Sequence, residues 1–309
     1  MRFNFRLVRE FSILAGLVFI IMTLSLCSSD RKITAYTITS PVTTVPFQKE
    51  PVYVGVRGNF DPRYPQFNSP DYWADTAIRL SENVPDSKPC LLWIVGLAAD
   101  DKQSCVMAYP SRNRMRNAQF KDADVTERCL ELFDRKGLSV WLQVEPAEAN
   151  VNDLIRSVLS RYSRHSCVKG FAVDLEWYQY RTWIYGKPLS DDDARDWLST
   201  IREYQPSYTL VLKHWLPTRL PPNAREGIYF LTDSQHFDGF QHQQDEFQKW
   251  GKNFSPSSVG YQIGYQEDED WWKKLPNPFL AIAKPLLQNI PNAKMVLWVN
   301  FTIRRLYPK

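Results

Sequence analysis

Glycine and histidine are scarce in this sequence. Only 12 of its 309 residues are glycine, and the pattern G-x-G-x-x-G is absent. An open, doubly wound sheet that binds a dinucleotide needs such glycines at its first turn, so their absence argues against that class. Only four histidines occur, without H-x-H or H-E-x-x-H spacing. A metal-dependent hydrolase using His214 is therefore a weak alternative, and we expect neither a cofactor nor a metal site.

An excess of charge is also lacking. The formal net charge is +4 at pH 7. Three arginines and one glutamate within the first ten residues account for +2 of this, so the rest of the chain carries +2. We find no basic run, and a charge of this size does not predict a nucleic-acid partner.

Cysteine is sparse as well. Besides Cys27, the chain contains Cys90, Cys105, Cys129 and Cys167, with spacings that match no zinc pattern. An even number of cysteines in an oxidising compartment permits one or two disulfide bonds. The alternative is buried thiols, because Cys90 and Cys167 begin predicted buried strands.

The first 27 residues have the pattern of a signal peptide or membrane anchor. Three arginines precede an apolar run, residues 11–26, which is shorter than the ~20 residues of a spanning helix. Cys27 follows and resembles the lipidation site of a bacterial lipoprotein, although Leu26 stands where that signal prefers a small residue. A signal anchor and ordinary secretion are the alternatives. All three predict an extracytoplasmic protein, secreted or membrane-anchored, and residues 28–49 are typical of an extended tether.

From residue 50 onward, short apolar runs alternate with helical patterns. We predict strands at residues 52–57, 90–96, 139–145, 168–177, 208–215, 228–233, 258–265 and 294–301, and helices at about 69–84, 122–136, 150–165, 190–204, 244–252 and 278–288. Eight strand and helix units predict an α/β fold, a single-domain (β/α)8 TIM barrel over residues 50–309. About eight residues follow the last run, so its outer helix should be reduced or missing.

The fourth run, C-V-K-G-F-A-V-D-L-E-W-Y from Cys167 to Tyr178, carries the main candidates for chemistry. Asp174 and Glu176 lie two residues apart at its C-terminal end, so both should point to one side. In a parallel barrel that side opens onto the mouth, where catalytic groups sit. We interpret Glu176 as a general acid whose pKa is raised by aromatic neighbours, with Asp174 as its partner.

Polar and aromatic residues close several other runs, and aromatic residues make up 14% of the chain. Aromatic side chains provide flat apolar faces on which sugar rings can stack. Ion pairing of the acids with Lys213 or Arg57, and packing of Trp298 in the interior, are the structural alternatives. The predicted substrate-binding residues at the mouth are Glu145, Trp177, Tyr178, Lys213, Trp215, Asp233, Gln262, Tyr265 and Trp298.

Residues 169–178 resemble the fourth-strand motif of the family-18 glycoside hydrolases, D-G-x-D-x-D-x-E followed by an aromatic residue. Here the sequence is K-G-F-A-V-D-L-E-W-Y, which matches at Asp174 and Glu176 and departs at Lys169 and Ala172. The resemblance implies a substrate-assisted mechanism, in which Asp174 orients an acetamido group and Glu176 protonates the leaving oxygen. Asp233, Tyr265 and Trp298 occupy places comparable to further residues of that family.

These patterns predict a glycoside hydrolase that acts on a polysaccharide, one that contains N-acetylamino sugars. The expected partners are this glycan and, through the N-terminal segment, a membrane. The alternative from another class is a catalytically inactive barrel that binds glycans. The sequence leaves the oligomeric state, the linkage and the stereochemical outcome open.

Overall fold

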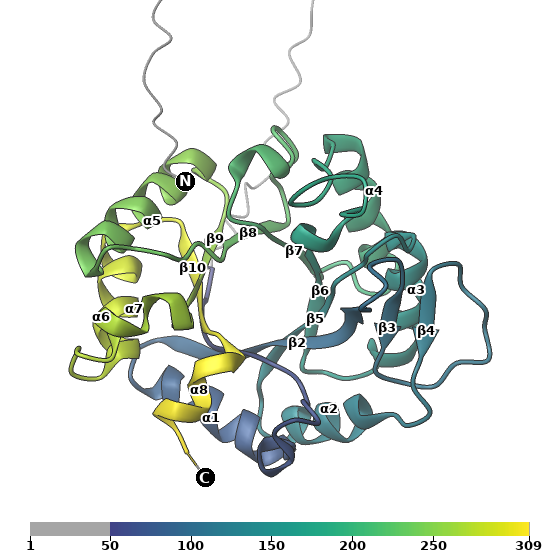
Figure 1. Cartoon of the computed structure of the whole chain (residues 1–309), viewed down its shortest axis with the longest axis horizontal. Helices are drawn as coiled ribbons and strands as arrows, with labels where there is room; N and C mark the ends of the chain where they lie inside the picture. Colours follow the sequence, from purple (N-terminus) through teal and green to yellow (C-terminus); the bar gives the residue numbers. More distant parts are fainter. Residues whose placement is uncertain (1–49, 309) are drawn as a thin grey trace, which may run out of the picture. The chain divides into compact units, whose positions relative to one another are not determined.

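The computed structural model describes residues 50–308. The predicted leader with Cys27 and the predicted tether lie outside the described residues. Eight parallel strands close into a barrel, because β1 pairs with both β2 and β10 (Figure 1). The barrel strands are β1 Val52–Gly58, β2 Ser87–Ala98, β5 Ser139–Val144, β6 Val168–Asp174, β7 Thr209–Lys213, β8 Ile228–Thr232, β9 Val259–Ile263 and β10 Ala293–Trp298. The predicted TIM barrel and its eight strands are confirmed.

An outer ring of helices surrounds the strands. It consists of α1 Pro70–Glu82, α2 Val125–Arg135, α3 Val151–Tyr162, α4 Asp191–Arg202, α5 Phe240–Phe254, α6 Glu269–Trp272, α7 Pro278–Asn289 and α8 Asn300–Leu306. The side chains of Asp124, Asn150 and Ser190 accept hydrogen bonds from backbone amides in the first turns of α2, α3 and α4. The final helix is reduced to seven residues, as predicted. No helix among residues 50–308 is long and apolar enough to cross a membrane.

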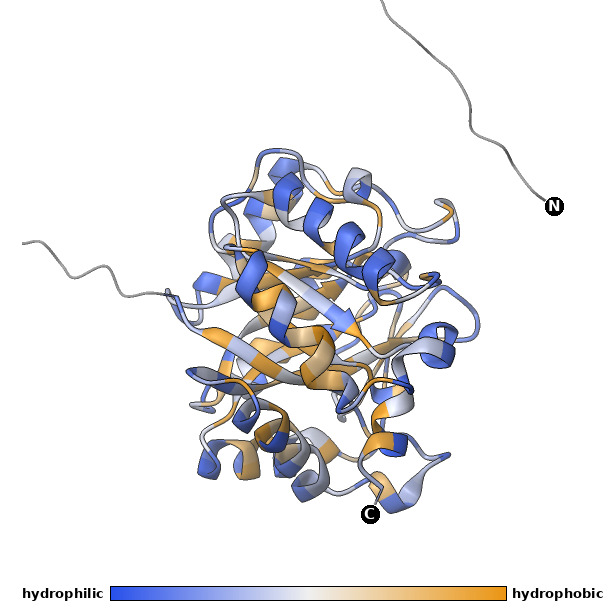
Figure 2. Cartoon of the chain, turned by 90° about the vertical axis from the view of Figure 1, so that its left-hand side faces the viewer, coloured by the Kyte–Doolittle hydropathy of each residue, from blue (hydrophilic) through white to orange (hydrophobic). Residues whose placement is uncertain are grey.

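The apolar runs form strands that are buried on two sides. Side chains alternate between the barrel interior and the layer beneath the helices, as the two-residue period of a strand requires. The interior cluster contains Cys90, Leu92, Trp141, Ala172, Val211, Tyr229, Leu231, Met295 and Leu297. A larger apolar cluster lies between the strands and the helices. Figure 2 shows this distribution as orange strands behind helices that carry much of the blue surface.

Two short strands, which the sequence pattern does not predict, extend the sheet beyond the barrel. The end of β2 pairs antiparallel with β3 Cys105–Met107, which pairs with β4 Ala118–Phe120. Three-residue strands are too short for a clear alternation of apolar and polar side chains. They form because the last residues of the twelve-residue β2 offer them an edge.

The four cysteines of the described region are buried free thiols, so the disulfide alternative is wrong. Cys90 lies in the barrel interior, whereas Cys105, Cys129 and Cys167 belong to the layer outside it. The wall of strands separates Cys90 from the other three. Side-chain packing accounts for all four residues.

Candidate active site

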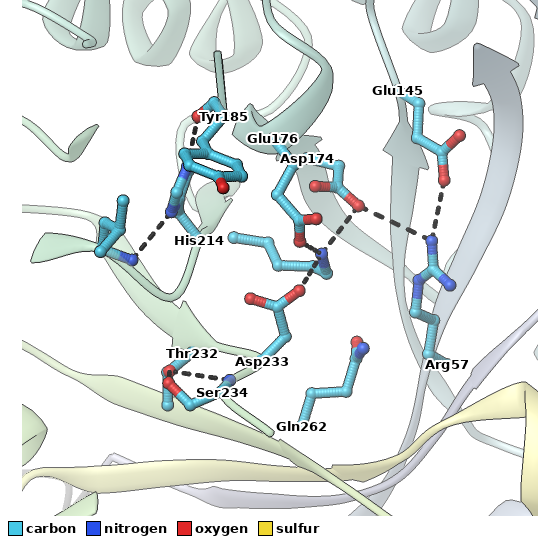
Figure 3. A network of polar contacts seen from close by, with 12 residues as sticks. Arg57, Glu145, Asp174, Glu176, Tyr185, His214, Thr232, Asp233, Ser234 and Gln262 are labelled. Carbon is cyan, nitrogen blue, oxygen red and sulfur yellow. Dashed lines mark hydrogen bonds and ion pairs between the residues drawn. The ribbon is translucent and has the colours of Figure 1, made fainter. Parts of the chain in front are cut away.

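The strand alternation that fills the barrel with apolar side chains delivers polar ones at its C-terminal end. On β5, Trp141 belongs to the interior cluster, and Gln143 follows two residues later on the same side. The pattern repeats from Ala172 to Asp174 on β6 and from Val211 to Lys213 on β7. Together with Arg57 on β1 and Gln262 on β9, these side chains form a polar layer at the barrel mouth. Figure 3 shows Arg57, Asp174 and Gln262 of this layer.

Lys213 lies at the centre of this layer and contacts three carboxylates. Asp174 is its register partner on the adjacent strand, and the Asp174 Oδ2 atom lies 2.9 Å from the lysine Nζ atom. Glu176 Oε1 lies 2.5 Å from the same nitrogen, and Asp233 Oδ2 also contacts it. The ammonium group thus occupies the centre of the three acids. No group of histidine, cysteine and acidic side chains among residues 50–308 is arranged to hold a metal ion.

Arg57 is the second cation of the layer. Its Nη2 atom lies 3.0 Å from Glu145 Oε1 and 3.7 Å from Asp174 Oδ2. Its Nε atom donates to Gln143 Oε1 at 3.0 Å. The second oxygen of Glu145 accepts a hydrogen bond from the backbone amide of Ala98, at 3.1 Å. Arg57 therefore links Glu145, which follows β5, to Asp174 at the end of β6.

The layer holds four carboxyl groups and only two cations. Burial raises the pKa of three of these carboxyl groups, those of Glu145, Asp174 and Glu176. Burial raises the pKa of Glu176 to about 7, and the charge of Asp233 adds to this, while Lys213 opposes it. Burial likewise raises the pKa of Glu145 to about 7 against the opposing effect of Arg57. Burial alone would lower the pKa of Lys213, but the surrounding carboxylates raise it well above its ordinary value. The lysine therefore remains a cation, and Glu176 can carry a proton near neutral pH.

Access to the site differs among the acids. The side chain of Glu176 is 24% exposed, against 1% for Asp174 and 5% for Asp233. Three buried oxygens of the layer receive no hydrogen bond within the described region, namely Asp174 Oδ1, Asp233 Oδ1 and Gln262 Oε1. A carboxylate or amide oxygen can only accept, so this part of the site is suited to groups that donate, such as hydroxyls.

His214 and Tyr265 flank the layer as neutral groups. The Nε2 atom of His214 lies 2.7 Å from the backbone oxygen of Tyr185, and its Nδ1 atom accepts from the amide of Leu216 at 2.8 Å. Burial lowers the pKa of this histidine, and both nitrogens are engaged, so it fastens a loop and does not serve as a base. Burial raises the pKa of Tyr265 well above its ordinary value, and its hydroxyl accepts from Gln262.

Aromatic side chains gather in the loops of this face. Trp177 packs against Tyr180, with ring centres 4.8 Å apart, and Trp215 packs against Tyr185 at 5.4 Å. The exposed large hydrophobic residues of the described region are Tyr64, Trp183, Ile184, Tyr185 and Phe301. All five follow the C-terminal ends of β1, β6 or β10. Exposed apolar surface is therefore concentrated around the mouth, as expected of a binding face.

Two predicted binding residues do not face the mouth. Tyr178 is buried and packs edge-on against Trp197 of α4, at 5.3 Å between ring centres. Trp298 is fully buried and packs against Trp272 at 5.2 Å. The reason is alternation: Leu297 points into the barrel, so its neighbour Trp298 points outward under the helices. These two predictions of binding roles are wrong.

Of the other predicted residues, Glu145, Asp174, Glu176, Lys213, Asp233, Gln262 and Tyr265 lie in or beside the polar layer, and Trp177 and Trp215 lie in the loops around it. Gln143 was missed. It is fully buried and its amide nitrogen lies 3.5 Å from Asp174 Oδ2. A lone polar residue within the apolar run V-W-L-Q-V was the signal that could have identified it.

Comparisons with known proteins give similarity in fold. No protein-family model matches the chain, and no curated protein matches it. Among solved structures, a candidate alpha-L-fucosidase of Bacteroides thetaiotaomicron is 11% identical with a TM-score of 0.49, over 88% of this chain and 92% of that one. A glycoside hydrolase family 5 enzyme of Prevotella bryantii, in complex with a xyloglucan tetradecasaccharide, is 10% identical with a TM-score of 0.44, over 83% and 91%.

An exo-beta-1,4-mannosidase of an Opitutaceae bacterium is 13% identical with a TM-score of 0.46, over 82% of this chain. This chain spans 54% of the mannosidase. At such identities these similarities concern the fold alone.

Proposed function

We propose that this protein is a glycoside hydrolase that acts on a polysaccharide, with Glu176 as its general acid. The observation that carries the proposal is the environment of this carboxyl group. It is the most exposed acid of the polar layer, with a pKa raised to about 7, next to an aromatic rim. A group of this kind can protonate the oxygen of a leaving sugar at neutral pH, as hydrolysis of a glycosidic bond requires.

A second carboxylate must manage the positive charge that develops on the sugar. Asp174 is buried beneath Glu176 between Lys213 and Arg57, so we assign it the role of positioning Lys213. Asp233 approaches from β8 and contacts the same lysine nitrogen as Glu176. Because the carboxylates of Glu176 and Asp233 contact the same nitrogen, they lie closer to each other than the roughly 6.5–9.5 Å that separates the two carboxyl groups of inverting enzymes. We therefore propose a retaining reaction.

In this scheme Glu176 gives its proton to the glycosidic oxygen as Asp233 forms a bond to the anomeric carbon. Water then breaks that bond, and the ionised Glu176 accepts its proton. The presence of Asp233 makes attack by the substrate's own acetamido group unnecessary. Polysaccharides with N-acetylamino sugars remain the proposed substrate class, on the resemblance of residues 169–178 to the family-18 motif.

The test compares Glu176→Gln with Glu131→Gln, a control at an exposed position on α2. We expect Glu176→Gln to lower the release of reducing ends from an amino-sugar polysaccharide by roughly 10²–10⁴-fold. Affinity for the polysaccharide should survive. Equal turnover in the two variants would rule out Glu176 as the acid.

The second candidate is a glycan-binding barrel without turnover. It is favoured by the three contacts of Lys213, which leave Asp174, Glu176 and Asp233 all ion-paired. This alternative predicts that the wild-type protein binds the glycan and releases no reducing ends between pH 4 and 8.

We also propose that the protein acts outside the cytoplasm, attached through Cys27, on the pattern of residues 1–27. Cys27→Ser should abolish incorporation of a labelled fatty acid and move the protein out of the membrane fraction. An unchanged membrane fraction without label would favour a signal anchor.

A further inference from the structure

A cavity lies outside the barrel mouth, between helix α3 and the loop that joins β3 to β4. Its volume is about 940 Å³. Figure 1 shows β3, β4 and α3 side by side at one edge of the barrel. The charged residues of its lining are Arg112, Arg114, Arg116, Arg156, Arg161 and Asp153. We call this cavity the arginine groove.

The arginine groove has a strong excess of positive charge, with five arginines against one aspartate. Two arginines on the helix side are neutralised by carboxylates. Arg156 binds Glu203 with two nitrogens, and the Nε atom of Arg161 lies 2.6 Å from Asp124. Arg112, Arg114 and Arg116 on the loop side are exposed, and none has an ion pair within the described region. These three guanidinium groups are therefore free to bind an anion.

The composition of the groove narrows the class of ligand. Guanidinium groups bind carboxylates and phosphates through paired hydrogen bonds. Proteins that bind single-stranded nucleic acids usually add exposed aromatic faces on which the bases stack. Two aromatic residues line the groove. Tyr109 is only 2% exposed, and Tyr204 is half-buried, with its hydroxyl donating to the backbone oxygen of Arg156 at 3.3 Å. One half-buried ring beside five arginines favours recognition by charge over base stacking, and therefore a carboxylate-bearing polysaccharide over a nucleic acid.

The position of the groove connects it to the mouth. Helix α3 begins six residues after Glu145, and β3 pairs with the end of β2, whose Ala98 amide binds the same glutamate. Both walls of the groove are therefore attached at the Glu145 side of the polar layer. A polymer leaving the mouth on this side would meet the loop arginines next.

We propose that the arginine groove is a binding site for an acidic polysaccharide, recognised through the carboxylates of its uronic acid units. The site goes beyond the proposed hydrolysis, because binding there requires no turnover. If the proposed function holds as well, the substrate carries both N-acetylamino sugars and uronic acids.

The experiment uses the full-length protein with Glu176→Gln, so that no probe is cleaved. Hyaluronan fragments supply N-acetylamino sugars and carboxylates, and N-acetylglucosamine oligomers are the neutral counterpart. We expect the triple change Arg112→Gln, Arg114→Gln and Arg116→Gln to weaken hyaluronan binding roughly tenfold or more, because each lost contact is charge-assisted. Binding of the neutral oligomers should not change.

The matched control removes the same charge elsewhere, by Lys88→Gln, Arg128→Gln and Arg135→Gln at exposed positions. This control should bind hyaluronan as before. Equal affinities of the two triple variants for hyaluronan would overturn the proposal. So would a single-stranded DNA probe that binds as tightly as hyaluronan and is lost in the same variant. Failure of the proposed hydrolysis would show in the reducing-end assay of Glu176→Gln and leave these binding results intact.

Discussion

The two ends of the barrel interior are built from the same strands and differ completely in chemistry. At the N-terminal end, Tyr53, Trp141 and Tyr229 pack edge to face, with ring centres 4.8–6.4 Å apart. Two residues further along β5, Gln143 belongs to the polar layer with Arg57 and Asp174. A stable barrel needs a filled interior. Aromatic side chains fill it at high packing density and at a low free-energy cost of burial. Filling the interior therefore does not by itself account for the polar layer.

Energetics sharpen this contrast. Replacing a buried ion pair by well-packed apolar residues is often neutral or stabilising, whereas removal of one partner is strongly destabilising. Lys213 with its three carboxylates is thus a structure that a purely stabilising core would not contain. The aromatic end stabilises the barrel, and the charged end depends on that stability.

The largest expected effect on stability comes from a substitution at the aromatic end. Trp141→Ala should lower the free energy of unfolding by about 3–5 kcal/mol, because it leaves a cavity and an unpaired Thr209 hydroxyl. The loss should be the same at pH 5 and pH 8, since no titrating group is removed. Denaturant unfolding at both pH values measures it, and a loss below about 1 kcal/mol would contradict the assigned role.

An effect of similar size at pH 8 is expected at the charged end. Lys213→Met leaves Asp233 buried without its counter-charge and Asp174 with Arg57 alone, at a cost of about 3–5 kcal/mol. Unlike Trp141→Ala, this loss should shrink at pH 5, because burial raises the pKa of Asp174 and loss of Lys213, which lowers that pKa, favours its protonation further. Lys213→Arg keeps the charge and is the control. A loss independent of pH would indicate that only packing was removed.

A smaller effect, of opposite sign, is expected for Glu176→Gln. The pKa of Glu176 is about 7 in the folded protein, above its ordinary 4.5, so the folded state holds a proton that the unfolded state releases. Its contribution to stability is complete below pH 4.5 and is lost as the pH rises through 7. The variant should therefore exceed the wild type by about 1–3 kcal/mol at pH 8 and match it near pH 4. Equal stability at pH 8 would contradict the raised pKa.

The smallest effect on stability is expected at the rim. Trp183 is 41% exposed, so Trp183→Ala should change the free energy of unfolding by less than about 0.5 kcal/mol. Affinity for an oligosaccharide should nevertheless fall roughly three- to tenfold, because the aromatic face is lost. The adjacent Ile184→Ala removes exposed apolar surface without an aromatic ring and should leave the affinity unchanged. Calorimetric titration of both variants distinguishes stacking from general hydrophobic contact.

The fold was largely predictable because strand periodicity is a local property. Long apolar runs such as 90–96 favoured strands buried on two sides, and eight of them allowed closure into a barrel. The prediction that Glu176 shares this strand with Asp174 is wrong, because β6 ends at Asp174 and Glu176 lies in the short 3-10 turn Leu175–Trp177 that follows. Both carboxylates nevertheless contact Lys213. The β3–β4 extension was not predictable, since three-residue strands carry no period of their own and depend on the edge that β2 offers.

The sequence by itself determined which residues could reach the mouth, because a period of two fixes the sides of every strand once its ends are known. Only the tertiary structure decided which of them meet. The register of β6 against β7 placed Lys213 beside Asp174, and the pairing of β1 and β5 with the two edges of β2 brought Arg57 of β1 to Glu145, which follows β5. Distances between strands far apart in the chain depend on closure and register, and neither is encoded in any short stretch of sequence.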